Sequence, residues 1–239
     1  VSKPKPMVEL NFKPILWHIM KIFSNQGINN FIICSGYKSY VIKEYFNNYF
    51  LNNTNVKIDL KKNKIEFLNK PKENWEITIV NTGLNSNTGG RLKRIKKFIL
   101  KNENFYMTYG DGLANVNLKR LYLNHIKSKK IATVTAVKSK ARFGNIVLKK
   151  NLALKFEEKN VSKDNWINGG FFVLNNKIFD YIKNDQTIFE KDSLKKITLK
   201  KQLNVYKHTG FWQPMDTLKE KNFLENLITK NNIPPWLRV

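Results

Sequence analysis

The chain has 239 residues, and its 43 lysine and arginine side chains outnumber 18 aspartate and glutamate side chains, giving a formal net charge of +25. Hydrophobic residues make up 41% of the chain, enough for a sizeable core, which excludes a disordered basic tail. No apolar run approaches the roughly 18 residues of a membrane-spanning helix, and no charged-then-apolar signal segment opens the sequence. The single cysteine, Cys34, excludes an internal disulfide framework and favours a reducing cytoplasm.

The positive charge is spread along the chain and is not gathered into one basic segment. Only five of the basic residues are arginine, the side chain that base-reading and phosphate-clamping sites favour for its bidentate fork. The lysines stand among abundant asparagine and isoleucine, a composition typical of an AT-rich genome. We interpret most of the charge as solvated surface, with weak nucleic-acid binding by local lysine clusters as the alternative.

Apolar spacing predicts helices and strands in alternation. In chain order we expect a helix over 15–23, a strand over 31–34, a helix over 41–49, a hairpin over 56–67, a strand over 77–80, a helix over 92–99, a strand over 105–109, a helix over 118–125 and a strand over 131–137. Strands then dominate, over 145–148, 152–156, 171–174 and 203–206, before a last helix over 218–228. This alternation predicts an α/β fold with parallel strands, in which ligands bind at the carboxyl ends of strands.

Two aspartates are candidates for binding a metal. Asp111 follows the strand over 105–109 and stands between Gly110 and Gly112, which let a ligand approach the backbone. The same tripeptide is also a common turn. Asp216, just before the last helix, could share one Mg²⁺ with Asp111 or could simply be the N-cap of that helix. The residues alone leave both alternatives open.

Two basic segments are candidates for binding phosphate. Gly83 is followed by a glycine-rich stretch that includes Thr88, Gly90 and Arg91 and opens a helix. Such a helix start offers free backbone N–H groups to a phosphate, to which arginine adds a charged contact; the alternative is a flexible loop capped by threonine. Lys5 stands between two prolines that hold the chain extended, unless this basic start is disordered.

A further segment has the chemistry of a sugar site. Glu158 and Lys159 precede Asn168 and Gly169 by about ten residues. A glutamate and an asparagine can bond sugar hydroxyls, and a lysine can contact a phosphate. The alternative is a pair of edge strands with solvated charges.

Taken together, seven segments resemble the sugar-phosphate nucleotidyltransferases, or sugar-nucleotide pyrophosphorylases, and in particular their cytidylyl-transferring branch. The segments are KPKPMVEL at 3–10, KPILWHIMKIFS at 13–24, FIICSGYKSYVIKEYFNNYF at 31–50, TGGRLKR at 88–94, YGDGLA at 109–114, INGGFFVLN at 167–175 and GFWQPMDTL at 210–218. The resemblance implies a Rossmann-like three-layer nucleotidyltransferase fold of the GT-A type. Its central sheet would be mixed and mainly parallel, beside a strand-rich sugar-binding part.

The resemblance also implies a reaction and its residues. CTP and glucose 1-phosphate would give CDP-glucose and pyrophosphate by Mg²⁺-assisted in-line attack at the α-phosphorus. The CDP-glucose would be used to make lipopolysaccharide O-antigen or another surface polysaccharide. By resemblance, Asp111 and Asp216 would bind Mg²⁺, and Lys5 and Arg91 would be catalytic. The nucleotide side would comprise Lys5, Gly83, Thr88, Gly90, Arg91 and Asp111, and the sugar-phosphate side Gly144, Glu158, Lys159, Asn168 and Gly169. Another nucleotide or sugar phosphate, or a non-catalytic basic binding protein, is the alternative.

The sequence departs from the family at its start. The family begins with a strand and a GGxGTRL phosphate loop that ends in the Pro4-Lys5 found here. We therefore expect one domain over 1–239 that lacks the family's first strand and most of that loop. We also expect a homo-oligomer, with apolar residues near Trp236 as a candidate interface, and neither nucleic acid nor membrane as a partner.

Overall fold

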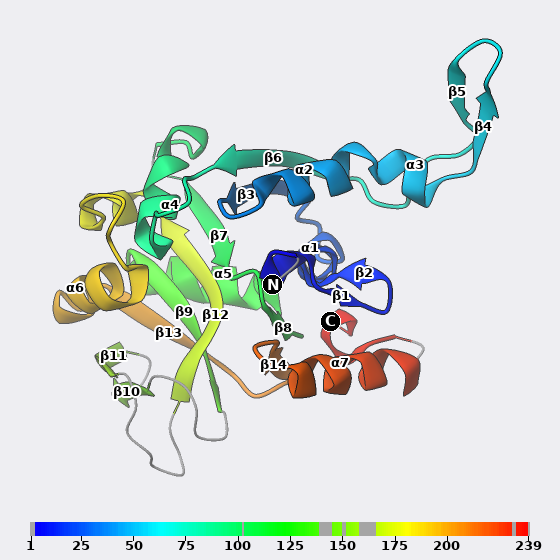
Figure 1. The fold of residues 1–239 in the computed structure, drawn as a ribbon. Coiled ribbons are helices and arrows are strands. Elements are labelled where there is room, and N and C mark those ends of the chain that lie inside the picture. Colours follow the sequence, from blue (N-terminus) through cyan, green and yellow to red (C-terminus); the bar gives the residue numbers. More distant parts are fainter. Residues whose placement is uncertain are drawn as a thin grey trace.

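A mixed six-stranded sheet forms the centre of the computed structural model, which describes residues 3–101, 103–138, 145–149, 152–157, 166–230 and 233–238 (Figure 1). The strand order is β10-β11-β13-β9-β12-β7. The bounds are β7 Asn104–Thr108, β9 Ala132–Lys138, β10 Asn145–Lys149, β11 Leu152–Glu157, β12 Trp166–Asn175 and β13 Leu203–His208. A separate parallel pair joins β3 (Asn30–Ser35) to β6 (Glu76–Asn81).

Fewer neighbouring strands of this sheet run parallel than the sequence predicts. β13 runs parallel to β9, but β12 runs antiparallel to both β9 and β7. The reason lies in the connection from β9 to β12, which contains strands β10 and β11. Antiparallel neighbours need no helical crossover, whereas parallel neighbours do. The prediction of an α/β fold with a mixed sheet is confirmed.

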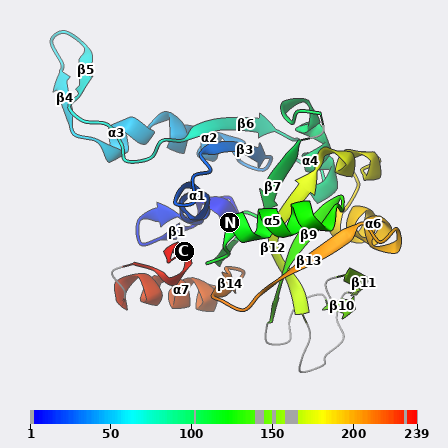
Figure 2. The same ribbon diagram turned by 180° about the vertical axis from the view of Figure 1, so that it is seen from behind.

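Strand β12 shows why the fold has three layers. Phe172 and Leu174 belong to a buried cluster with η3, η4 and α6, whereas the alternate residues Phe171 and Val173 pack with α1, α5 and α7. Successive residues of a strand face opposite sides of a sheet, so helices cover both faces, as the two opposite views show (Figures 1 and 2). The helical bounds are η1 Lys5–Met7, α1 Ile15–Ser24, α2 Ser39–Asn47, α3 Tyr49–Asn53, α4 Thr88–Arg94, η2 Lys96–Phe98, α5 Leu118–Ser128, η3 Asn176–Tyr181, η4 Phe189–Leu194, α6 Lys195–Leu199, α7 Leu218–Lys230 and η5 Pro235–Leu237.

Helix α4 differs from the helix expected over 92–99. It begins at Thr88 and ends at Arg94, and the short turn η2 follows it. Gly89 and Gly90 sit in its first turn against the backbone of 185–187, where a Cβ on Gly90 would overlap the carbonyl oxygen of Asp185. The absent side chains therefore allow a close approach that apolar spacing does not reveal.

Three two-stranded ladders complete the strands that the structure describes. They are β1 (Glu9–Leu10) with β2 (Lys13–Pro14), β4 (Val56–Asp59) with β5 (Lys64–Phe67), and β8 (Gly112–Ala114) with β14 (Trp212–Pro214). The β4–β5 hairpin confirms the hairpin prediction and projects from the body beyond α3; we call it the arm (Figures 1 and 2). Its apolar side chains remain largely exposed, among them Ile58 (53%), Leu60 (88%) and Phe67 (47%).

Trp236 corrects one expectation about the surface. Its side chain is completely buried, in ring contact with His18 and Phe211. The turn η5 thus closes the core beside α1, and Trp236 is not part of an exposed apolar cluster. Within the described ranges, no helix is long and apolar enough to cross a membrane.

Candidate active site

Two aspartates and a lysine meet at the edge of a cavity, although 106 and 211 positions separate Lys5 from Asp111 and Asp216. Lys5, at the start of η1, donates from Nζ to Asp111 Oδ2 at 2.7 Å and to an oxygen of Asp216. Partial burial acts to lower the pKa of Lys5, but its bonds to the two carboxylates outweigh that effect and raise the pKa above its ordinary value. The amine therefore stays charged at neutral pH.

Short-range packing brings the three segments together. The ladder between β8 and β14 lies directly beside both aspartates, and the backbone N–H of Met215 donates to the carbonyl of Asp111 at 2.8 Å. Pro6 packs on Gly110, where an added Cβ would come within 2.9 Å of the proline ring. The glycine before Asp111 thus admits the segment that carries Lys5.

The N-cap alternative for Asp216 is excluded by the start of α7. Glu220 N–H donates to Thr217 Oγ1 at 3.2 Å, and the Glu220 carboxylate accepts from the backbone N–H groups of Thr217 and Asp216 at 2.9 and 2.8 Å. This reciprocal pattern is a capping box formed by Thr217 and Glu220. The carboxylate of Asp216 is left to contact Lys5.

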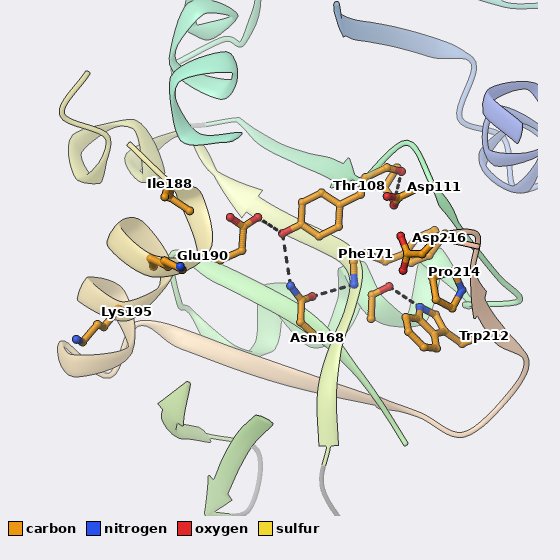
Figure 3. A pocket seen from close by; sticks show the side chains of 15 residues that line it. Thr108, Asp111, Asn168, Phe171, Ile188, Glu190, Lys195, Trp212, Pro214 and Asp216 are labelled. Atoms are coloured by element: carbon orange, nitrogen blue, oxygen red, sulfur yellow. Dashed lines mark hydrogen bonds between the residues drawn. The ribbon is translucent and has the colours of Figure 1, made fainter. Parts of the chain in front are cut away.

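A cavity of about 660 Å³ opens beside these aspartates (Figure 3). Its wall is formed by the end of β7, the kinked part of β12, η4, the start of α6 and β14; the lining residues are Thr108, Tyr109, Asp111, Gly112, Asn168, Gly169, Gly170, Phe171, Ile188, Glu190, Lys191, Lys195, Trp212, Pro214 and Asp216. Trp212 Nε1 donates to the Gly169 carbonyl at 2.8 Å, which fixes the wall near Asn168. In Figure 3, Asp111 and Asp216 lie at one side of the cavity and Glu190 and Lys195 at the other.

Arg91 and Gly83 lie together, away from the cavity lining. Arg91 Nη1 donates to Thr82 Oγ1 at 2.9 Å, and Nη2 donates to the Leu84 carbonyl at 3.3 Å. Gly83 has φ of +88°, and Gly36, after β3, packs on the guanidinium. These residues occupy the carboxyl ends of the parallel strands β3 and β6, where α/β sheets bind ligands.

The expectation of free N–H groups at the glycine-rich helix start is wrong. Gly89 N and Gly90 N both donate to the Thr187 carbonyl, at 3.0 and 3.3 Å. Thr88 is not a cap on a flexible loop, because Asn87 occupies the N-cap position and the Thr88 hydroxyl donates to Glu190 Oε2 at 2.8 Å. The glycines thus seat α4 on the segment before η4.

Glu190 and Tyr109 are site residues that sequence reasoning missed. The Tyr109 hydroxyl donates to Glu190 Oε1, and burial together with the Glu190 charge raises the pKa of Tyr109 well above its usual range. A buried tyrosine hydroxyl needs a polar partner, which is the one signal that the sequence offers. It could not identify the partner, which lies 81 positions away.

The predicted sugar side is described only in part. Asn168 and Gly169 line the cavity, and Asn168 Oδ1 accepts from Gly170 N at 2.8 Å. Gly144, Glu158 and Lys159 lie outside the described residues.

Comparison with known proteins matches the chain to one family. The family model described as "Nucleotidyl transferase" matches residues 1–226. Glucose-1-phosphate cytidylyltransferase of Salmonella typhimurium is 47% identical over 98% of this chain and 91% of its own length. The probable glucose-1-phosphate cytidylyltransferase of Bacillus subtilis is 44% identical, over 93% of this chain and 86% of that protein.

Solved structures share the fold. HddC from Yersinia pseudotuberculosis complexed with GMP-PN superposes with a TM-score of 0.75 at 20% identity, covering 93% of this chain and 89% of that one. UDP-glucose pyrophosphorylase complexed with UDP-glucose gives a TM-score of 0.71 at 17% identity, covering 95% and 90%. The chain therefore belongs to the nucleotidyl transferase family, where its similar relatives include glucose-1-phosphate cytidylyltransferases.

Proposed function

We propose that this protein transfers the cytidylyl group of CTP to glucose 1-phosphate, giving CDP-glucose and pyrophosphate. The proposal depends above all on the 47% identity, over 98% of the chain, to a glucose-1-phosphate cytidylyltransferase. The convergence of Lys5, Asp111 and Asp216 beside a cavity supports it, because the reaction needs positive charge beside its phosphates, which Lys5 supplies and a cation held by the two aspartates would add.

The site has donors that fit Mg²⁺. In the described ranges no group of three or more histidine, cysteine, aspartate or glutamate side chains could hold a metal. Asp111 and Asp216, however, direct carboxylate oxygens onto one cation, the ammonium of Lys5. Mg²⁺ is commonly bound by one or two carboxylates, with waters and substrate phosphates as its other ligands. We propose that these two aspartates hold Mg²⁺, which when bound would neutralise nucleotide phosphate charge.

The remaining work is positioning and charge neutralisation. The attacking oxygen belongs to a phosphate that is already an anion, so the reaction needs no general base. Lys5, kept charged by its neighbours, would contact phosphate near the reacting centre. Arg91, with Gly83, Thr88 and Gly90, would hold the nucleotide side. Asn168 and Gly169, with Gly144, Glu158 and Lys159, would hold glucose 1-phosphate.

A substrate panel tests the assignment. Protein expressed from its complete open reading frame is incubated with Mg²⁺, glucose 1-phosphate and each of CTP, UTP, GTP, ATP and dTTP, and pyrophosphate and nucleotide sugar are measured. We expect CTP to be preferred, with CDP-glucose as product. GTP belongs in the panel because a D-glycero-α-D-manno-heptose 1-phosphate guanylyltransferase of Campylobacter jejuni is 33% identical. Preference for another nucleotide contradicts the cytidylyl assignment.

We further propose that the enzyme acts in the cytoplasm as a homo-oligomer and supplies CDP-glucose for surface polysaccharide. The exposed apolar side chains of the arm support contact with a second copy, since a two-stranded hairpin is marginally stable alone.

A further inference from the structure

Glu190 is an acidic side chain in the cavity beside which we propose that two phosphorylated substrates react. Among the described lining residues, the other carboxylates are Asp111 and Asp216, the proposed metal ligands. A carboxylate that faces substrate phosphates repels them. A carboxylate that binds no metal is therefore expected to have another role in the site. The contacts of Glu190 show what that role is.

Both oxygens of Glu190 accept hydrogen bonds from segments of the site. Oε2 accepts from Thr88 Oγ1 at 2.8 Å, and Oε1 accepts from the Tyr109 hydroxyl. Thr88 is the first residue of α4, the helix that carries Arg91, and Tyr109 lies two residues before Asp111. One carboxylate therefore bonds to the start of that helix and to the strand end that leads to the proposed metal ligand.

The same chain of bonds reaches the sugar side. Asn168 Nδ2 donates to the Tyr109 hydroxyl at 3.4 Å, as Figure 3 shows beside the bond to Glu190. The Tyr109 ring has two close neighbours on β12: it packs edge-on to Phe172 with centroids 5.8 Å apart, and a Cβ on Gly170 would come within 2.9 Å of it. A tyrosine packed this tightly transmits the position of Glu190 to its own backbone.

We propose that Glu190 is a positioning residue for nucleotidyl transfer, which holds Thr88 and Tyr109 so that the nucleotide side and the Asp111 segment keep one fixed relation. Glu190 acts through these two hydroxyls and does not contact substrate. This inference rests on the proposed function, and its closing measurements separate the failure of one from the failure of the other.

The chemistry of the two partners explains why a glutamate is needed. Thr88 Oγ1 already accepts from Phe189 N at 2.9 Å, so its hydroxyl hydrogen is directed to Glu190. Tyr109 likewise donates its hydrogen. A carboxylate accepts from both donors, whereas a glutamine presents an oxygen to one and an N–H donor to the other. Glu190→Gln therefore leaves one hydroxyl without its acceptor.

Steady-state kinetics test the coupling. We expect Glu190→Gln to lower kcat/KM for both CTP and glucose 1-phosphate about tenfold or more, the size expected for a lost hydrogen bond to a charged group. Thr88→Val and Tyr109→Phe should each lower it about fivefold. The double variants Glu190→Gln/Tyr109→Phe and Glu190→Gln/Thr88→Val should lose less than the product of their single losses.

Two results would overturn the proposal. If Glu190→Gln loses activity while Thr88→Val and Tyr109→Phe keep it, Glu190 acts on substrate directly. If the losses multiply in the double variants, the residues are not coupled. Glu225→Gln, which removes a carboxylate from an ion pair with Lys221 on α7, is the matched control and should behave like the unaltered enzyme.

A spectroscopic measurement is independent of turnover. In protein labelled with 3-fluorotyrosine, the Tyr109 ¹⁹F resonance is assigned by its loss in Tyr109→Phe, and Glu190→Gln should shift it while Glu225→Gln does not. An unmoved resonance overturns the contact, whatever the activity. If the unaltered protein transfers no nucleotide but the resonance does move, the proposed function fails and the network stands.

Discussion

The ladders β8–β14 and β4–β5 are both short and antiparallel, yet their surroundings differ completely. In the first, Leu113 has no exposed surface and lies in the core cluster beside α1 and α7. In the second, the arm, Leu60 just after β4 is 88% exposed. The first ladder joins segments about 100 positions apart, and the second joins neighbours along the chain. The stability of a strand pair therefore depends less on its ladder hydrogen bonds than on the side chains that pack against it.

The largest effect that we expect is a loss of activity when the aspartates beside the β8–β14 ladder are changed, with no such loss for a change in the arm. Asp111→Asn and Asp216→Asn should each lower Mg²⁺-dependent turnover about 100-fold or more, because each removes a charge from the proposed metal site. Circular dichroism should show an intact fold. Asp59→Asn, the matched change in the arm, should stay within about twofold of the unaltered rate. Near-normal turnover of either site variant would reject that aspartate's role.

The next largest effect that we expect is on stability, measured by urea unfolding of variants in the two ladders. Leu113→Ala should lower the free energy of unfolding by about 2–5 kcal/mol, since it leaves a cavity in the core. Leu60→Ala should change it by less than about 0.5 kcal/mol, because its side chain is already in water. Equal losses would mean that the arm is packed in solution.

Acid should destabilise the body of the molecule. Burial lowers the pKa of His18 to about 4, from an ordinary value of 6.5. Between those values the unfolded chain binds a proton that the folded chain does not, so stability falls as pH falls. His18 alone should cost about 2 kcal/mol at pH 5 relative to pH 7. Urea midpoints at the two pH values measure this loss, and His18→Gln should reduce it; a flat profile contradicts the burial argument.

The smallest effect on stability that we expect comes from a charged substitution in the arm. Leu60→Lys should leave the free energy of unfolding of the dilute protein within about 0.5 kcal/mol. If the arm contacts a second copy, the same change should reduce the mass measured by light scattering during gel filtration. Lys62→Gln, on the same turn, is the control. An unchanged mass for Leu60→Lys would reject the arm as the contact.

The sequence allowed the positions of the strands along the chain to be predicted, but not what packs around each strand. Apolar residues predict both the β4–β5 hairpin and central strands such as β12, but they cannot distinguish the exposed Ile58 from the buried Val173. Helix α4 was expected to begin at Leu92, because the close packing of Gly90 on Asp185 involves residues far apart in the chain. Partners at such separations have no local signature.

In the candidate site, too, some residues could be predicted from the sequence and others could not. Asp111, Asp216 and Lys5 stand in recognisable motifs, and the structure brings them together. Glu190 stands in no motif, and its importance depends on two hydroxyls about 100 and 80 positions away. The expectation of exposed apolar residues near Trp236 came from the family's oligomers and is wrong for Trp236 itself, whose ring packs on His18 and Phe211.

The separation of Lys5 from Asp216 also orders events during synthesis. Once Lys5 has been made, 211 further positions must be added before Asp216 exists. At typical rates of 5–20 residues per second this takes about 10–40 s. Asp111 is added after the first 106 of these positions, so only in the second half of the interval can Lys5 meet Asp111 but not the second carboxylate. For a little under half of its synthesis the nascent chain thus holds one proposed metal ligand without the other, and the pair is complete only when the segment just before the last helix has been made.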